Sequence, residues 1–210
     1  MRLGLLGMSG VGKTYWATKL AEAGFECWHC DDLIAARLQT ILGQPLVTSY
    51  DMGHWMGFPY EPGFKEREEI FVSCEAEVLQ EIIDHLAQER NSTSNLVVDM
   101  TGSAIYAGES IFTRLREFIA VVYLSLSSEL HQYLLSEYAA HPVSLVWQGQ
   151  FHKKADETNA LALAHCYSHL IAFRESRYEK YCDITLEYHT HRRGQLTSEE
   201  FLQCIRKAAH

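Results

Sequence analysis

The sequence feature that most constrains the fold is a glycine-rich segment at residues 7–14, Gly-Met-Ser-Gly-Val-Gly-Lys-Thr. It fills every fixed position of the pattern G-x-x-x-x-G-K-T. A short apolar run, residues 3–6, precedes it, and residues 13–23 that follow have the composition of a helix. A strand that turns through glycines into a helix is the context in which this pattern binds phosphate. The sequence therefore predicts a phosphate-binding loop between the first strand and the first helix.

The residue types in this loop suit a nucleoside triphosphate, taken here as ATP, together with Mg²⁺. Glycines have no Cβ, so the loop can curl around a phosphate and turn backbone N–H groups inward. A lysine can then reach the β- and γ-phosphates, and a threonine hydroxyl can ligate the metal ion. We expect the nucleotide to be bound by Gly7, Ser9, Gly10, Val11, Gly12, Lys13 and Thr14.

Apolar runs of strand length alternate with helical spacing along the rest of the chain. The runs are residues 3–6, 25–28, 96–98, 119–124 and 184–186. This alternation predicts an α/β fold with three layers, in which a mostly parallel five-stranded sheet carries helices on both faces. Together with the glycine-rich loop it indicates a P-loop NTPase fold, and the 210 residues fit one domain, 1–210.

Two helices have clear signals of their own. Apolar residues recur every three or four positions between 65 and 90, which predicts one long helix whose Glu-rich opposite face is solvated. Thr197 and Glu200 form a capping box at the start of a final helix.

Two stretches, 43–64 and 141–155, do not match any regular element. They contain most of the prolines and several aromatic residues, which argues against disorder. Long irregular loops in a compact domain are usually binding loops or lids. We expect 43–64 to be a small substrate-binding insert and 141–155 to be a lid region.

The charge balance bears on the partners. With 18 Lys and Arg against 27 Asp and Glu, the formal charge is -9 and the field of the protein repels nucleic acid and anionic membranes. No apolar run approaches the ~20 residues of a membrane helix. We expect a cytoplasmic protein, a monomer or small homo-oligomer, that binds small molecules.

Six cysteines are present, two of them in the sequence Cys27-Trp-His-Cys30. This spacing occurs in redox-active dithiols, but no second pair completes a zinc site. If this segment is a strand, the two sulfurs point to opposite faces, so ordinary buried thiols are favoured.

Carboxylates follow two of the predicted strands. Asp99 ends the run 96–98, and a carboxylate there can hold Mg²⁺ beside Thr14, although it could instead cap the next turn. Asp31 and Asp32 follow the second strand, at the sheet edge where ligands bind in such folds. One of the two is expected to cap the helix from Leu33. We favour Asp31 as the carboxylate that accepts the proton of an acceptor hydroxyl.

The order of these motifs resembles that of shikimate kinases over nearly the whole chain. The matching features are the loop 7–14, Asp31 with Ile34, Phe64-Lys65-x-x-Glu68, Thr101-Gly102-Ser103, and Arg174 with Tyr178. The resemblance implies that the P-loop binds ATP and Mg²⁺, that Asp31 contacts substrate hydroxyls, and that Lys65, Gly102 and Arg174 line or bind the rest of the substrate. The other interpretation of Arg174 is a surface ion pair with Glu175 or Glu179.

The chain also departs from that family. Lys65 stands in the place of an arginine, and a lysine cannot make the bidentate contact of a guanidinium. His29 stands in the place of an aspartate that assists Mg²⁺. No arginine occurs between Arg116 and Arg174, so only Lys153 and Lys154 could act as lid cations. These departures weaken the assignment of shikimate itself as the acceptor.

The leading hypothesis is a P-loop small-molecule kinase that transfers a phosphoryl group from ATP to a hydroxyl of a small, anionic metabolite. The catalytic candidates are Lys13, Asp31, Lys153 and Lys154. The candidates for substrate binding are Asp31, Lys65, Gly102 and Arg174, and those for the metal ion are Thr14 and Asp99. Two alternatives stay open. One is a nucleotide-binding regulatory module that has lost transferase activity, and the other is a nucleoside or nucleotide kinase whose base stacks on Trp55, Phe58 or Tyr60.

Overall fold

The structure is a computed structural model that describes residues 1–43, 48–192 and 196–209. Five strands form one sheet in the order β2-β3-β1-β4-β5, and every pair of neighbours is parallel. The strands are β1 (Arg2–Leu6), β2 (Glu26–His29), β3 (Leu96–Asp99), β4 (Ala120–Leu124) and β5 (Ile184–Leu186). The predicted five strands are confirmed to within a residue at each end, and the α/β P-loop kinase fold is confirmed with them.

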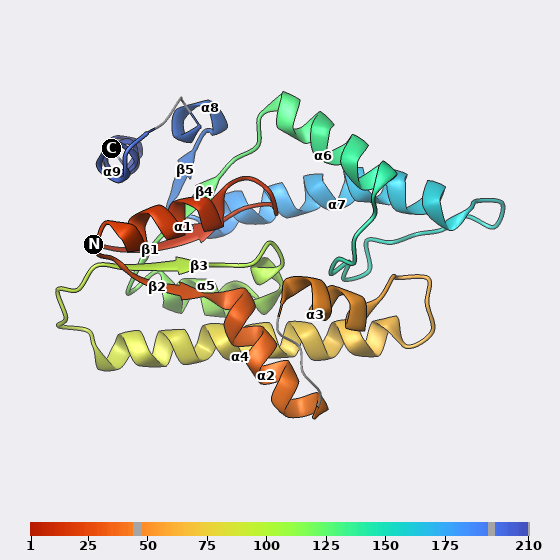
Figure 1. Ribbon diagram of the computed structural model, residues 1–210, viewed down its shortest axis with the longest axis horizontal. Coiled ribbons are helices and arrows are strands. Elements are labelled where there is room, and N and C mark those ends of the chain that lie inside the picture. The colour runs from red at the N-terminus through yellow and green to blue at the C-terminus, as the bar shows by residue number, and fades with distance from the viewer. Residues whose placement is uncertain (44–47, 193–195, 210) are drawn as a thin grey trace.

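Helices follow the strands and cover both faces of the sheet (Figure 1). They are α1 (Lys13–Glu22), α2 (Cys30–Leu42), α3 (Ser49–Met56), α4 (Phe64–Gln88), the short 3₁₀ helix η1 (Ala104–Ala107), α5 (Glu109–Leu115), α6 (Ser128–Ala140), α7 (Asn159–Tyr181), α8 (Tyr188–His191) and α9 (Ser198–Ala208). The predicted helices at 13–23 and 65–90 correspond to α1 and α4. The capping box at Thr197 is confirmed at the start of α9.

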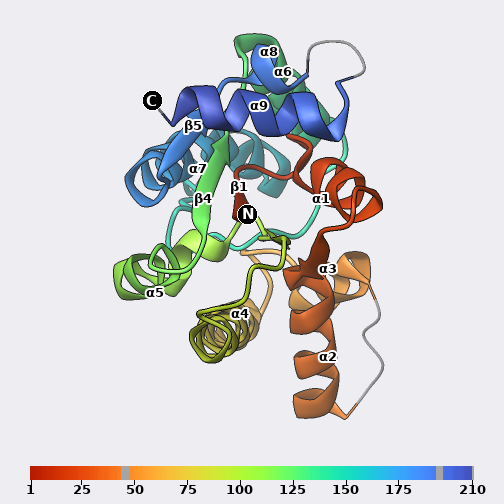
Figure 2. The same ribbon diagram turned by 90° about the vertical axis from the view of Figure 1, so that its left-hand side faces the viewer.

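Two apolar clusters, one on each face of the sheet, form the core. Successive side chains of a strand point to opposite faces, so Val122 packs with α1 and α9, whereas Val121 packs with α4, α5 and α7. Figure 2 shows α1 and α9 together on one side of the strands and α4 and α5 on the other. Because both faces are covered, the inner strands β3 and β4 are almost wholly apolar, as in other parallel sheets.

The expectation that 43–64 has no regular element is wrong for its middle part. Residues 49–56 form α3, because Thr48 and Asp51 make a reciprocal capping box that satisfies backbone N–H groups at its start. Residues 44–47 of this stretch lie outside the described residues. The stretch 141–155 has no helix or strand, as expected.

Within the described ranges, no helix combines the length and the apolar character that crossing a bilayer requires. All six cysteines are free. Cys27 lies on β2 and Cys30 opens α2, and both are free thiols. Cys30 is buried, as the interpretation expects, whereas Cys27 is only half-buried.

Candidate active site

A cavity of about 450 Å³ opens at the carboxyl ends of β1, β2 and β3. The three strands run in the same direction, so the loops that follow them meet at one edge of the sheet (Figure 1). The cavity is lined by Ser9, Gly10, Gly12, Lys13, Thr14, Tyr15, Asp31, Ser49, Met52, Gly53, Met56, Phe71, Asp99, Met100, Thr101, Gly102, Ser103, Ser144, Leu145, Val146, Arg174 and Arg192. Most of the residues predicted for the site are therefore brought together.

The loop 7–14 forms one end of the cavity. Gly10 and Gly12 have φ angles of 84° and 108°, which side chains rarely adopt, so glycine is needed for this curl. The Lys13 ammonium donates hydrogen bonds to the carbonyl oxygens of Gly7 at 2.9 Å and Met8 at 3.0 Å. Desolvation by burial lowers the pKa of Lys13 to about 8, against the opposing charges of Asp99 and Asp31. The loop fits a phosphate, because it combines a buried cation with the amino end of α1.

Thr14 and Asp99 both line the cavity, as a metal site beside the loop would require. Asp99 is buried at the end of β3, where His29 is its register partner on β2. The Nδ1 atom of His29 lies 3.1 Å from Oδ2 of Asp99, and its Nε2 atom lies 3.3 Å from the sulfur of Cys27. A hydroxyl and a carboxylate are oxygen donors of the kind that Mg²⁺ prefers.

Asp31 and Asp32 occupy the first turn of α2 and face different surroundings. His29 is the N-cap of α2, so the expectation that one of these aspartates caps the helix is wrong. Asp31 lines the cavity, whereas Asp32 lines a separate surface groove with His29 and Cys27. Desolvation raises the pKa of Asp31, Lys13 opposes this shift, and the neighbouring carboxylates of Asp99 and Asp32 add to it. A raised pKa suits a carboxylate that accepts a proton.

Arg174 is a buried cation on α7, with only 3% of its surface exposed. Its Nη2 atom donates a hydrogen bond of 2.6 Å to the carbonyl oxygen of Val146, and its guanidinium lies 5.6 Å from the centre of the Tyr106 ring. Its Nε atom has no hydrogen-bond partner among the described residues. The interpretation as a surface ion pair with Glu175 or Glu179 is therefore wrong. A buried guanidinium with an unused donor beside a cavity is suited to an anionic ligand.

The turn 101–103 lies between Arg174 and the loop 7–14. A Cβ atom on Gly102 would lie 3.4 Å from Nη1 of Arg174 and 3.5 Å from the backbone nitrogen of Ser9. The Tyr178 hydroxyl donates a hydrogen bond of 2.6 Å to the carbonyl oxygen of Gly102. Because Gly102 has no side chain, the turn leaves room in the cavity beside two donors, Nη1 of Arg174 and the backbone N–H of Ser9.

Glu75 on α4 is hydrogen-bonded to this turn and is not among the site residues predicted from the sequence. One of its oxygens accepts hydrogen bonds from the Thr101 and Ser103 hydroxyls, and the other has no partner within the described part of the chain. Burial raises the pKa of Glu75 to about 7, against the hydrogen bonds from Thr101 and Ser103 and the charge of Arg174. A signal existed, because Glu75 is spaced four residues from Phe71 and three from Val78, on the apolar face of the helix.

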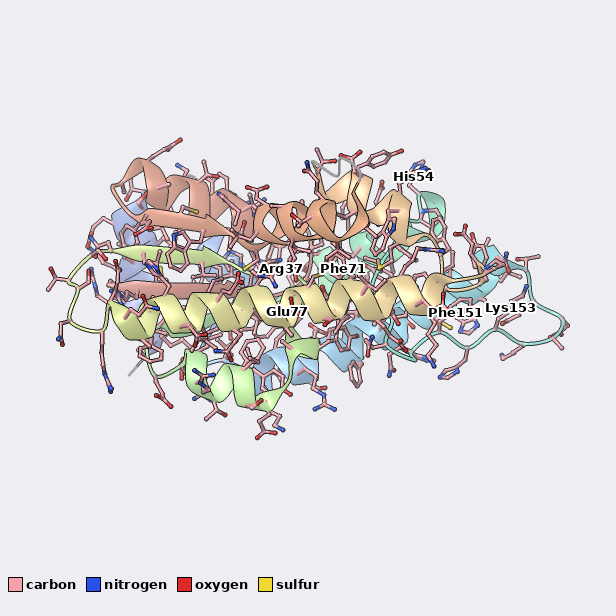
Figure 3. All side chains as sticks on the ribbon, turned by 90° about the horizontal axis from the view of Figure 1, so that it is seen from below. Arg37, His54, Phe71, Glu77, Phe151 and Lys153 are labelled. Atoms are coloured by element: carbon pink, nitrogen blue, oxygen red, sulfur yellow. The ribbon has the colours of Figure 1, made fainter. Side chains whose placement is uncertain are left out.

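Gly7 and Val11 belong to the loop 7–14 but do not line the cavity, and Val11 is buried in the core. Three further predicted site residues lie away from the cavity. Lys65 is exposed on α4, with its ammonium 3.9 Å from a carboxylate oxygen of Glu69. The Lys153 ammonium donates a hydrogen bond of 2.6 Å to Asn159, and Lys154 lies 3.9 Å from Glu157. Figure 3 shows Lys153 at the end of the molecule where α4 begins. None of the three lines the cavity.

The segment 141–155 is packed against α4 and α7 and forms one wall of the cavity. The backbone N–H groups of Trp147 and Gln148 both donate to one carboxylate oxygen of Glu68, and Val146 is held by Arg174. Ser144, Leu145 and Val146 line the cavity, whereas Lys153 and Lys154 lie farther along the segment. The part of the segment that reaches the site carries no cationic side chain.

Phe58 and Tyr60 of the insert, which were candidates for stacking on a nucleoside base, contact other aromatic side chains instead. The Phe58 and Tyr60 rings stack on each other, with centres 5.6 Å apart, and Tyr60 lies 6.4 Å from Phe151. Neither Phe58, Tyr60 nor Trp55 lines the cavity. The insert contributes Met52 and Met56 of α3 instead, so its wall is flexible and apolar.

Arg192, directly after α8, lines the cavity, and no motif in the sequence marked it as a site residue. Its Nη1 atom would lie 3.5 Å from a Cβ placed on Gly12, and its guanidinium lies 5.6 Å from the centre of the Tyr15 ring. It reaches the loop 7–14 from the other end of the chain, and no sequence pattern marks that approach.

Comparison with solved structures shows the fold. A shikimate kinase from Acinetobacter baumannii, solved in complex with shikimate, matches with a TM-score of 0.58 and 22% identity over 98% of this chain and 90% of that one. A shikimate kinase from Bacteroides thetaiotaomicron matches with a TM-score of 0.59 and 15% identity over 99% and 97%. A dephospho-CoA kinase from Campylobacter jejuni matches with a TM-score of 0.52 and 11% identity over 98% and 94%. No family model and no curated protein sequence matches the chain. The fold is thus that of shikimate kinases and related P-loop kinases.

Proposed function

We propose that this protein is an ATP-dependent kinase that phosphorylates a hydroxyl group of a small, anionic metabolite. The observation that carries the proposal is that Asp31 and Arg174 line the same cavity as the loop 7–14. A phosphate cradle, a carboxylate and a buried guanidinium are the three elements that such a transfer needs. The fold shared with small-molecule kinases agrees with this function.

The residues divide the reaction between them. The loop 7–14 and Lys13 hold the phosphate chain, and Arg174 binds the anionic group of the acceptor. Asp31 accepts the hydroxyl proton while the acceptor oxygen forms its bond to the terminal phosphorus, the bond to the bridging oxygen breaks, and ADP leaves. Thr14 and Asp99 would hold Mg²⁺, which neutralises charge on the phosphates when bound.

The cavity wall opposite the loop limits the acceptor. Met52, Met56 and Phe71 give it an apolar side, while Arg174 is a buried cation beside the turn 101–103. With Lys65 outside the cavity, a single guanidinium would meet the acceptor's anionic group. We therefore expect a hydroxy acid with a partly apolar body. We further expect residues 1–210 to act as one domain in the cytoplasm, as a monomer or small homo-oligomer.

The test is an ATP-consumption screen over sugars, hydroxy acids and nucleosides, with Lys13→Ala as the background. Asp31→Asn should retain ATP binding and lose acceptor-dependent turnover. Asp32→Asn is a matched control, because it removes a neighbouring carboxylate that does not line the cavity. If every acceptor gives only the Lys13→Ala background, the proposed function is wrong.

The second candidate is a nucleotide-binding regulatory module without transferase activity. It is favoured by the position of Lys153 and Lys154 outside the cavity, which leaves the lid segment without a cation at the site. Calorimetry would identify it through Mg²⁺-dependent ATP binding without acceptor-stimulated ADP release. A nucleoside or nucleotide kinase has less support, because Trp55, Phe58 and Tyr60 do not line the cavity. Protection of the fold by nucleosides but not by hydroxy acids would select it.

A further inference from the structure

We propose that Arg192 contacts the phosphate chain of the bound nucleotide and supplies the guanidinium that the segment 141–155 lacks. The inference rests on the nucleotide-binding part of the proposed function and does not depend on the acceptor. It assigns a binding role to a residue beyond β5, against Gly12 of the loop 7–14.

The first observation is the position of Arg192 against the loop. It lines the same cavity as Gly10, Gly12 and Lys13. Its Nη1 atom would be 3.5 Å from a Cβ on Gly12, and its Cδ atom would be 3.9 Å away. The side chain therefore lies along the backbone of the loop that curls around a phosphate. From this position its guanidinium can reach that phosphate.

The second observation is the contact that orients the guanidinium. It lies over the ring of Tyr15, the residue after Thr14, with 5.6 Å between the guanidinium carbon and the ring centre. Tyr15 also lines the cavity. A guanidinium that lies over an aromatic face keeps its N–H groups at its edge. These groups can still donate hydrogen bonds in the plane of the guanidinium. Arg192 itself is exposed, and its guanidinium contacts the Tyr15 ring at the cavity.

The third observation concerns the charges around the phosphates. Asp31 and Asp99 line the cavity near Lys13 and repel an anionic ligand, while Lys13 is the cation inside the loop. Within the described residues Arg192 is engaged by Tyr15 and forms no ion pair with a carboxylate. Its charge is thus available to a phosphate, where a charge-assisted and bidentate contact is strong.

In the phosphoryl transfer, the Arg192 cation would stabilise negative charge on the phosphate oxygens. Negative charge spreads over the phosphate oxygens as the bond to the bridging oxygen breaks, and P-loop enzymes place an arginine near it. The chain has no arginine between Arg116 and Arg174, and the lysines of the lid segment lie outside the cavity. Among the described residues, Arg174 and Arg192 are the arginines that line the cavity, and Arg192 is the one next to Gly12 of the loop.

The experiment measures nucleotide binding by calorimetry in the presence of Mg²⁺, with ATP, ADP and adenosine as probes. The variants are Arg192→Ala and Arg192→Lys in the full chain. Arg206→Ala is the matched control, because Arg206 is another exposed arginine, paired with Glu199 on α9 at 2.9 Å. Melting temperatures of all variants report whether the fold is retained.

We expect Arg192→Ala to weaken ATP and ADP binding by about 10- to 100-fold and to leave adenosine binding unchanged, because the lost contact is to phosphate. Arg192→Lys should recover part of the loss, and Arg206→Ala should bind as the wild type does. Wild-type affinity of Arg192→Ala for ATP would overturn the inference, as would an equal loss for adenosine. If the wild-type protein binds no ATP, the proposed function fails as well, so the two failures are distinguishable.

Discussion

The imidazole Nδ1 atom of His29 lies 3.1 Å from Oδ2 of Asp99, across the last register pair of β2 and β3. This contact orients a carboxylate that lines the cavity beside Thr14. A residue that departs from the shikimate kinase pattern thus touches the candidate metal ligand and is placed to position it.

His29→Ala should weaken the affinity for Mg²⁺, so that ATP binding requires a higher Mg²⁺ concentration. Asp99 loses the partner that orients its carboxylate, and loss of such a contact typically costs 10- to 100-fold in metal affinity. The measurement is ATP binding at a series of Mg²⁺ concentrations, and binding without Mg²⁺ should not change. Cys27→Ala, which removes only the contact to the other ring nitrogen, should have a smaller effect. Identical Mg²⁺ titrations for wild type and His29→Ala would exclude a positioning role.

Glu75→Gln should change how stability depends on pH. Burial raises the pKa of Glu75 from 4.5 to about 7, so between these values the folded state keeps a proton that the unfolded state releases. The wild type should therefore lose stability, relative to the variant, as pH rises through this window, by up to about 3 kcal/mol. Urea unfolding at pH 5 and pH 8 checks this. A wild-type-to-variant difference that is the same at both values would contradict it.

Glu68→Ala should loosen the segment 141–155. Glu68 is buried and accepts the backbone N–H groups of Trp147 and Gln148, which would lose their partner. We expect a loss of about 3 kcal/mol in the free energy of unfolding and faster tryptic cleavage at Lys153 or Lys154. Glu69→Ala is the control, since Glu69 is an exposed neighbour on the same helix. Equal cleavage rates for the two variants would show that Glu68 does not fasten the segment.

Gly102→Ala should separate binding from stability. The Cβ atom would meet Arg174 and Ser9 at ordinary contact distances, so the fold should tolerate it with little change in melting temperature. The methyl group would nevertheless fill the space between two donors of the cavity. For the acceptor found in the screen we expect KM to rise about 10-fold or more, as for a misplaced substrate, with ATP affinity unchanged. An unchanged KM would remove the turn from the acceptor site.

Local patterns in the sequence predicted the elements that depend on interactions between residues close together in the chain. The strands are apolar runs, and the start of α9 is a capping box that needs only Thr197 and Glu200. The loop 7–14 and the carboxylate of Asp99 follow from strands whose carboxyl ends must share one edge of a parallel sheet. Helix α3 was missed because it is two turns long and contains Gly53, although Thr48 and Asp51 cap it.

The rest of the site depends on contacts between distant segments. Lys65 and Arg174 were predicted together, yet only Arg174 lines the cavity, because the Lys65 side chain lies on the solvent-exposed face of α4. Glu75 lies on the buried face of the same helix, and its partners Thr101 and Ser103 come from the turn that follows β3. Arg192 reaches Gly12 from beyond β5. No spacing along the chain encodes these approaches.

The pairing of β1 has a consequence for how the protein acquires its binding loop. β1 lies at the centre of the sheet, where Leu3 pairs with Val97 on β3 and with Ala120 on β4. The loop that follows β1 is thus anchored only when chain segments about a hundred residues later have joined it. Such non-local pairings form slowly, because the entropy cost of closing the long intervening loop comes before the stabilising contacts form. During synthesis the loop leaves the ribosome before β3 and β4, and it becomes a phosphate cradle only after these strands have followed.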